Sequence, residues 1–189
     1  STVAIGGIAG TLIGALTGYF GGIVDEVLMR LNDAMTAFPS ILLALVLISL
    51  LGYGKSNLIL ALGLVFIPSF ARVSRGAFAS CRDKNYIQSA RLMGASRSRI
   101  LLVHILPNTA PVLLPAITIG FNNAVLAEAS MSYLSIGVQP PDASLGYMLS
   151  ESQGYLASAP WYALCTGGFI VLLILGVGLI GEGLQRRQR

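Results

Sequence analysis

The chain has 189 residues, of which 54% are hydrophobic and 11% are charged, and its formal net charge is +4. The mean hydropathy is +0.76. This composition excludes a soluble globular domain and indicates a membrane protein, whose basic excess relates to membrane insertion and not to nucleic acid.

Five apolar runs approach the roughly 20 residues that a helix needs to cross a hydrocarbon core. They are residues 3–20, about 35–51, about 58–73, about 110–129 and about 161–184. The sequence therefore predicts an all-α, polytopic transmembrane bundle in a single domain, 1–189. The second span could equally begin near Asp25, because charged residues interrupt the stretch before residue 35. Since Ser1 opens the chain within an apolar run, we expect a truncated amino end with one more span upstream.

Glycine recurs every four residues in the first span, at Gly6, Gly10, Gly14, Gly18 and Gly22. This spacing places the glycines along one face of a helix. Small residues in such a stripe let another helix approach closely in a membrane. We therefore predict tight helix packing here, with a sliding surface as the alternative.

The basic residues are distributed asymmetrically between the two sides of this topology. Lys55 alone falls on one side, and the other eleven fall on the opposite side: Arg30, Arg72, Arg75, Arg82, Lys84, Arg91, Arg97, Arg99, Arg186, Arg187 and Arg189. Because basic loops are retained in the cytoplasm, we predict an external amino end and a cytoplasmic carboxyl end. Cys81 and Cys165 then lie far apart, so we expect no disulfide between them.

The polar segment 85–107 separates the third and fourth spans. Asn85 is a suitable N-cap for a short helix, and Gln88 can reach back to it. Tyr86, Ala90 and Met93 would then share one face of this helix.

The same helix is expected to end at Gly94, which can adopt a left-handed turn. Ser96 would cap a second helix that runs toward Pro107. Because a helix this short is marginal in isolation, we interpret it as an element that inserts into a groove on another protein. The alternative is a basic loop anchored to the membrane surface by its arginines.

Motifs in this segment resemble the EAA loop of permease subunits of ATP-binding-cassette importers. They are Gln88-Ser89-Ala90, Gly94 and Ile105-Leu106-Pro107. The chain departs from the pattern at Gln88, where an acidic residue is usual, and at Ser89, where an alanine is usual.

Further motifs resemble the dipeptide, oligopeptide and nickel permease family, and specifically its second, C-type subunit. They are GYFGG at 18–22 followed by Asp25, MR at 29–30 with Asp33, FP at 38–39, YLSIG at 133–137, QPP at 139–141 and LG at 145–146. The resemblance covers nearly the whole chain.

The resemblance implies a multi-pass permease in the inner (plasma) membrane of a prokaryote. A homologous permease would form the other half of the pathway, cytosolic ATPases would supply energy, and an extracytoplasmic solute-binding protein would deliver the cargo. Peptides, nickel and metal chelates all remain open as cargo. The residues expected to couple to the ATPase are Tyr86, Gln88, Ser89, Ala90, Met93, Gly94, Leu106 and Pro107. The alternatives are a secondary transporter or channel, or a membrane assembly factor.

Polar residues in the fourth span are candidates for the translocation pathway. Asn122 and Asn123 lie midway along it, and Glu128 lies near its outer end. Such residues are unfavourable in lipid unless they are satisfied, so we predict that they line the pathway, with interhelical hydrogen bonding as the alternative.

The external segment 130–160 is predicted to fold as irregular and short helical structure over the outer mouth, where it would meet the binding protein or serve only as a scaffold. No catalytic site, metal site or cofactor is expected, because the chain has no P-loop, metal-ligand cluster or nucleophile–base arrangement.

Overall fold

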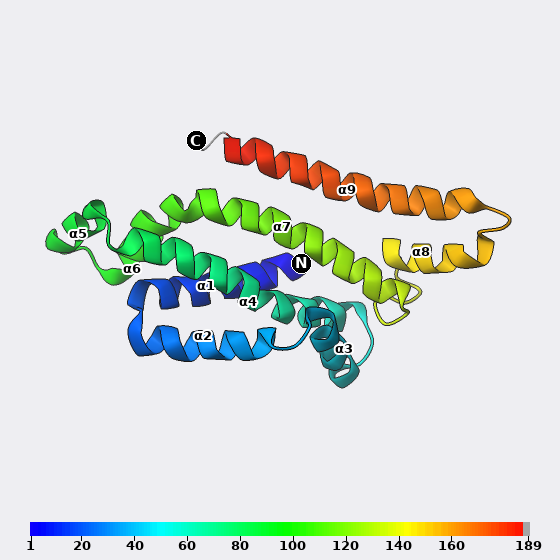
Figure 1. Ribbon diagram of the computed structural model, residues 1–189, viewed down its shortest axis with the longest axis horizontal. Helices are drawn as coiled ribbons and strands as arrows, with labels where there is room; N and C mark the ends of the chain where they lie inside the picture. The colour runs from blue at the N-terminus through cyan, green and yellow to red at the C-terminus, as the bar shows by residue number, and fades with distance from the viewer. Residues whose placement is uncertain (187–189) are drawn as a thin grey trace.

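The computed structural model describes residues 1–186 and is built of helices, as predicted (Figure 1). In chain order the elements are α1 (Thr2–Phe20), α2 (Gly22–Thr36), α3 (Ser40–Leu51), α4 (Lys55–Arg82), α5 (Asn85–Leu92), α6 (Arg97–Arg99), the π-helical η1 (Ile100–Ile105), α7 (Leu106–Tyr133), α8 (Leu145–Ser152), the 3₁₀ turn η2 (Gln153–Tyr155) and α9 (Pro160–Arg186). Arg187 and Arg189, which were counted with the basic tail, lie outside the described residues.

Four stretches of helix within residues 1–186 are individually long and apolar enough to cross a membrane. They are α1, α4, the continuous run Arg97–Tyr133, and α9. A fifth span is reached only if α2 and α3 are taken together, and these two helices are bent by 88°.

The second span was predicted wrongly as a helix over 35–51. Residue 35 lies at the end of α2, and the chain breaks between Thr36 and Ser40. Pro39 explains the break, because proline lacks an amide donor and disfavours helical geometry at the residue before it. The alternative start near Asp25 is closer, since α2 begins at Gly22.

The third and fourth spans both extend farther than predicted. The third was expected to end at 73, but α4 continues to Arg82. The fourth was expected to start near 110, but helix is continuous from Arg97. Pro107, in the first turn of α7, has no amide hydrogen to donate to the preceding turn. The helical hydrogen bonding is altered directly before it, where η1 is π-helical.

The glycine stripe packs α1 against α4, as predicted. A Cβ on Gly6 would lie 2.9 Å from the carbonyl oxygen of Gly63, and one on Gly10 would lie 2.6 Å from that of Ile67. One on Gly18 would lie 2.5 Å from the carbonyl oxygen of Arg75. The two backbones are therefore too close for any side chain between them.

Gly22 does not belong to this stripe. It begins α2, and a Cβ added there would meet nothing within 4 Å. Gly21 and Gly22 have φ angles of 64° and 56°, in the left-handed region that glycine adopts without steric penalty. This pair lets the chain reverse from α1 into α2.

The remaining helices extend the bundle outward from α1 and α4. α7 packs on α4, and α9 and α8 pack on α7. α5 and the carboxyl end of α9 lie at one end of the molecule, whereas α3 and α8 lie at the other (Figure 1).

Candidate functional sites

The short helix α5 starts at Asn85, one residue earlier than an Asn85 cap would place it. Its N-cap is Lys84, which has an extended backbone. The Lys84 carbonyl accepts hydrogen bonds from the backbone amides of Ile87 and Gln88. The predicted cap was therefore wrong. The Gln88 amide still reaches back, and it donates to the Asp83 carbonyl at 3.2 Å.

The end of α5 follows the prediction. Gly94 has a φ of 81° and donates to the Arg91 carbonyl, while Ala95 donates to the Ala90 carbonyl, each at 3.0 Å. This pair of hydrogen bonds is a Schellman motif, which requires a left-handed residue at the position of Gly94. Ser96 then caps the next helix by accepting from the Arg99 amide at 3.4 Å.

The two faces of α5 differ from those expected. Ala90 is only 3% exposed and, with the fully buried Ile87, packs on Phe78, Ile100 and other residues of a cluster made by α1, α4 and η1. Ala90 and Met93 therefore do not share an exposed face. The spacing of Ile87 and Ala90, three residues apart, was the signal for this inner face that was missed.

The outer face of α5 is a mixture of apolar and small polar residues. Leu92 is 89% exposed and Met93 is 81% exposed. Tyr86 is partly exposed, and its burial, together with the nearby Cys81 thiol, raises the pKa of its phenol. The other predicted coupling residues, Gln88, Ser89, Gly94, Leu106 and Pro107, are also exposed. Leu106 and Pro107 open α7, directly after Ile105 of the buried cluster.

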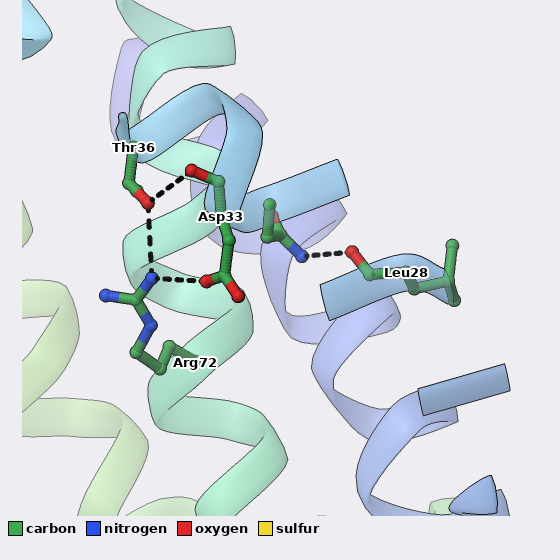
Figure 2. A network of polar contacts seen from close by, with 5 residues as sticks. Leu28, Asp33, Thr36 and Arg72 are labelled. Atoms are coloured by element: carbon green, nitrogen blue, oxygen red, sulfur yellow. Dashed lines mark hydrogen bonds and ion pairs between the residues drawn. The ribbon is translucent and has the colours of Figure 1, made fainter. Parts of the chain in front are cut away.

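A groove of mixed, mainly apolar lining lies between the α2–α3 break, α4 and α7. Its volume is about 490 Å³. The polar residues along it are Thr36, Ser40, Ser69, Arg72 and Asn123. The Arg72 guanidinium donates to the Asp33 carboxylate at 3.1 Å and to the Thr36 hydroxyl at 3.4 Å, and so ties α4 to the end of α2 (Figure 2).

Of the three predicted pathway residues, the structure places Asn123 in this groove. Asn122 lies outside its lining, and its side-chain oxygen is buried without a hydrogen-bond partner among the described residues. Glu128 accepts from Ser132 at 2.6 Å, and the Ser132 hydroxyl accepts from the Val138 amide at 3.0 Å. The Glu128 carboxylate therefore supports the turn after α7.

Arg72 was missed as a groove residue because it was counted, at the end of a span expected to finish at 73, with the basic residues that surround the next loop. Since α4 continues to Arg82, Arg72 lies ten residues before its end. Arg75 is also helical, and it donates two hydrogen bonds of 2.6 Å to Asp25.

The segment after α7 contains the short helical structure that was expected. α8 packs against α7 and α9. An ion pair of 3.4 Å joins Asp142 to Lys55, and the Tyr162 hydroxyl donates to Glu151 at 2.8 Å. Cys81 is buried in α4, and Cys165 is exposed in α9.

Comparison with known proteins identifies relatives over nearly all of the chain. Residues 10–189 match the family described as binding-protein-dependent transport system inner membrane component. The dipeptide transport system permease protein DppC of Alkalihalophilus pseudofirmus is 40% identical over 94% of this chain and 59% of its own length. The glutathione transport system permease protein GsiD of Pectobacterium atrosepticum is 36% identical over 97% of this chain and 61% of its own length. The chain thus spans about three-fifths of these relatives.

A similar fold occurs in a solved structure of the MetNI methionine ABC transporter in an inward-facing conformation. The TM-score is 0.80 at 21% identity, covering 98% of this chain and 88% of the other. At this identity the likeness concerns the fold alone.

Proposed function

Since the chain belongs to the family of binding-protein-dependent transport system inner membrane components, we propose that it acts as the permease subunit of an ATP-driven importer. It forms one half of a translocation pathway, and a homologous permease forms the other half. Cytosolic ATPases drive transport, and an extracytoplasmic solute-binding protein delivers the cargo. The arrangement of α5 is the observation that carries this proposal.

α5 combines a fixed inner face with a free outer face. Ile87 and Ala90 anchor the helix to the permease core, while Leu92 and Met93 project outward. Exposed apolar side chains on a short, anchored helix suit a groove on a partner protein, because burial there would remove them from water. We propose that this groove belongs to the ATPase. Residues 85–107 then form the coupling loop, in which Tyr86, Gln88, Ser89, Met93 and Gly94 make contact and Ala90 positions the helix.

The proposed orientation places α5 in the cytoplasm together with the carboxyl end of α9. The shared position of these two elements at one end of the molecule supports this orientation (Figure 1), as does the basic charge near them. The segment around α8 is then external and is the proposed contact for the solute-binding protein.

We propose a small peptide as the cargo. The names of the dipeptide and glutathione permeases favour it over nickel or a metal chelate. Arg72 lines the groove, and its ion-pair partner Asp33 lies outside the lining; their side chains are 56% and 64% exposed. A zwitterionic peptide requires a cation for its carboxylate and an anion for its ammonium group, and this pair offers both.

The test is uptake of a labelled dipeptide by liposomes that contain the complete complex with its binding protein. Uptake should require ATP and should cease when the ATPase is omitted. Arg72→Ala should reduce uptake while ATP hydrolysis persists. Uptake driven by an ion gradient without ATP would contradict the proposal and indicate the secondary transporter instead.

A further inference from the structure

An apolar groove of about 840 Å³ runs along the side of the bundle, between α1 and the helical run α6–η1–α7. Its α1 wall includes Ile8, Leu12 and Leu16, and its other wall includes Leu102, Leu106 and Leu113. Leu12 is 58% exposed and Leu102 is 63% exposed. Thr11 and Ser98 are the only lining residues with polar side chains in the described part of the chain.

A second, basic cavity of about 450 Å³ lies at the α5 end of the molecule. The Arg91 guanidinium lies 5.4 Å from the centre of the Tyr19 ring, and that of Arg97 lies 5.9 Å from the centre of the Phe20 ring. Ala95 and Ile100 complete its lining. Among the described residues, neither arginine forms an ion pair with a carboxylate.

The groove and the cavity adjoin one another. Leu16 of the groove precedes Tyr19 of the cavity by three residues, about one helical turn. Ala15 and Leu101, which line the groove, pack on the buried cluster that contains Tyr19 and Ile100 of the cavity. An apolar channel along the membrane-spanning helices therefore leads to two arginines and two aromatic rings at one end.

We propose that this composite site binds one anionic phospholipid of the cytoplasmic leaflet. The phosphate lies beside Arg91 and Arg97, and one acyl chain lies along the groove. Guanidinium groups bind phosphate through paired hydrogen bonds, and basic pockets between membrane helices favour anionic headgroups. The Tyr19 and Phe20 rings fit this location, because aromatic residues are enriched at the membrane–water interface, where lipid headgroups lie. A transmembrane helix from another segment could fill the apolar groove, but it would leave both arginines without an anion.

The site also connects the lipid to α5. Arg91 belongs to α5, whereas Arg97 begins the helical run that continues into α7. A phosphate held by both guanidinium groups would bridge the turn around Gly94 and restrain α5 relative to α7. The inference rests on the proposed orientation, although the binding itself does not depend on ATP-driven transport.

The test uses the complete complex in nanodiscs of phosphatidylcholine with a minor fraction of phosphatidylglycerol, and it counts retained lipid by native mass spectrometry. The parent and Arg99→Gln should retain phosphatidylglycerol, whereas Arg91→Gln/Arg97→Gln should bind it at least tenfold more weakly. Leu12→Trp, which narrows the groove and leaves both arginines in place, should also weaken retention. Inorganic phosphate should not displace the lipid.

A phosphatidylglycerol with a photoreactive group on its acyl chain locates the site directly. Cross-links should map to the peptides around Leu12 and Leu102. Equal retention by the double arginine variant and the parent would overturn the proposal. Cross-links that avoid both peptides would show that the acyl chain does not occupy the groove and would also overturn it. Because these readouts need no transport, they separate this inference from the proposed function.

Discussion

Arg75 of α4 and Asp25 of α2 form a bidentate ion pair. Nε and Nη2 of Arg75 donate to Oδ1 and Oδ2 of Asp25, respectively, each at 2.6 Å. This contact matters because Asn32 is the only buried residue of α2. With so little side-chain burial, the position of α2 depends on its ion pairs with α4.

Asp25→Asn should therefore loosen α2 without unfolding the bundle. We expect faster hydrogen exchange over residues 22–36 and a loss of about 1 kcal/mol of stability, because the pair is partly exposed. Glu26→Gln is the matched control, since Glu26 is exposed and forms no ion pair with the described residues. Unchanged exchange in Asp25→Asn would mean that packing alone holds α2.

Substitutions in the glycine stripe should depend on position. At Gly14 an added Cβ would lie 2.5 Å from Cβ of Ser74, whereas at Gly7 it would lie 3.9 Å from the Phe70 ring. Gly14→Ala should lower the thermal unfolding temperature and destabilise by about 1–3 kcal/mol, because α1 and α4 must separate. Gly7→Ala should behave like the parent. Gly14→Leu should prevent assembly, and Leu12→Phe should not.

Substitutions in α5 should separate the inner face from the outer face. Met93→Asp should leave the unfolding temperature unchanged and weaken co-purification of the ATPase, because its side chain lies outside the core. Ala90→Arg should lower the unfolding temperature even without the ATPase, since it inserts a charge into the buried cluster. If Met93→Asp retains full ATPase binding and uptake, the outer face of α5 is not the coupling surface.

Gly94→Val should strain the turn that ends α5. A Cβ there would meet nothing within 4 Å, so the effect comes from the backbone at φ 81° and not from crowding. We expect a destabilisation of about 1–2 kcal/mol, together with weaker coupling of ATP hydrolysis to uptake. Gly94→Asn should be milder, because asparagine tolerates left-handed geometry. Equal effects of the two variants would indicate a different cause.

Cysteine labelling in intact cells tests the orientation. In a Cys165→Ser background, a cysteine at Lys55 or Asp142 should react with an impermeant thiol reagent from outside, and one at Arg82 should react only after the membrane is opened. This pattern follows from the distribution of basic residues. Reaction of position 82 in intact cells would invert the assignment.

The sequence was sufficient for the features that depend on local chemistry. Apolar runs located α1, α4, α7 and α9, and glycine spacing identified the packing face of α1. The left-handed turn at Gly94 followed from a glycine placed at the end of a short predicted helix.

Features that depend on tertiary contacts were not predictable in the same way. Pro39 is visible in the sequence, but the 88° angle between α2 and α3 is set by how each helix packs. The inward face of α5 depends on Ile100 and Ile105, which approach Ile87 only in the folded chain. The pairing of Arg72 with Asp33 was not predicted, because the two residues lie 39 positions apart in the sequence.

Helix is continuous from Arg97 to Tyr133, so a tilt at one end of this rod moves the residues at its other end. At about 1.5 Å per residue, Arg97 and Asn123 are separated by roughly 39 Å along this rod. Each degree of tilt about its α6 end therefore displaces Asn123 by roughly 0.7 Å. A rotation of a few degrees imposed beside α5 would thus displace the groove wall at Asn123 by ångströms.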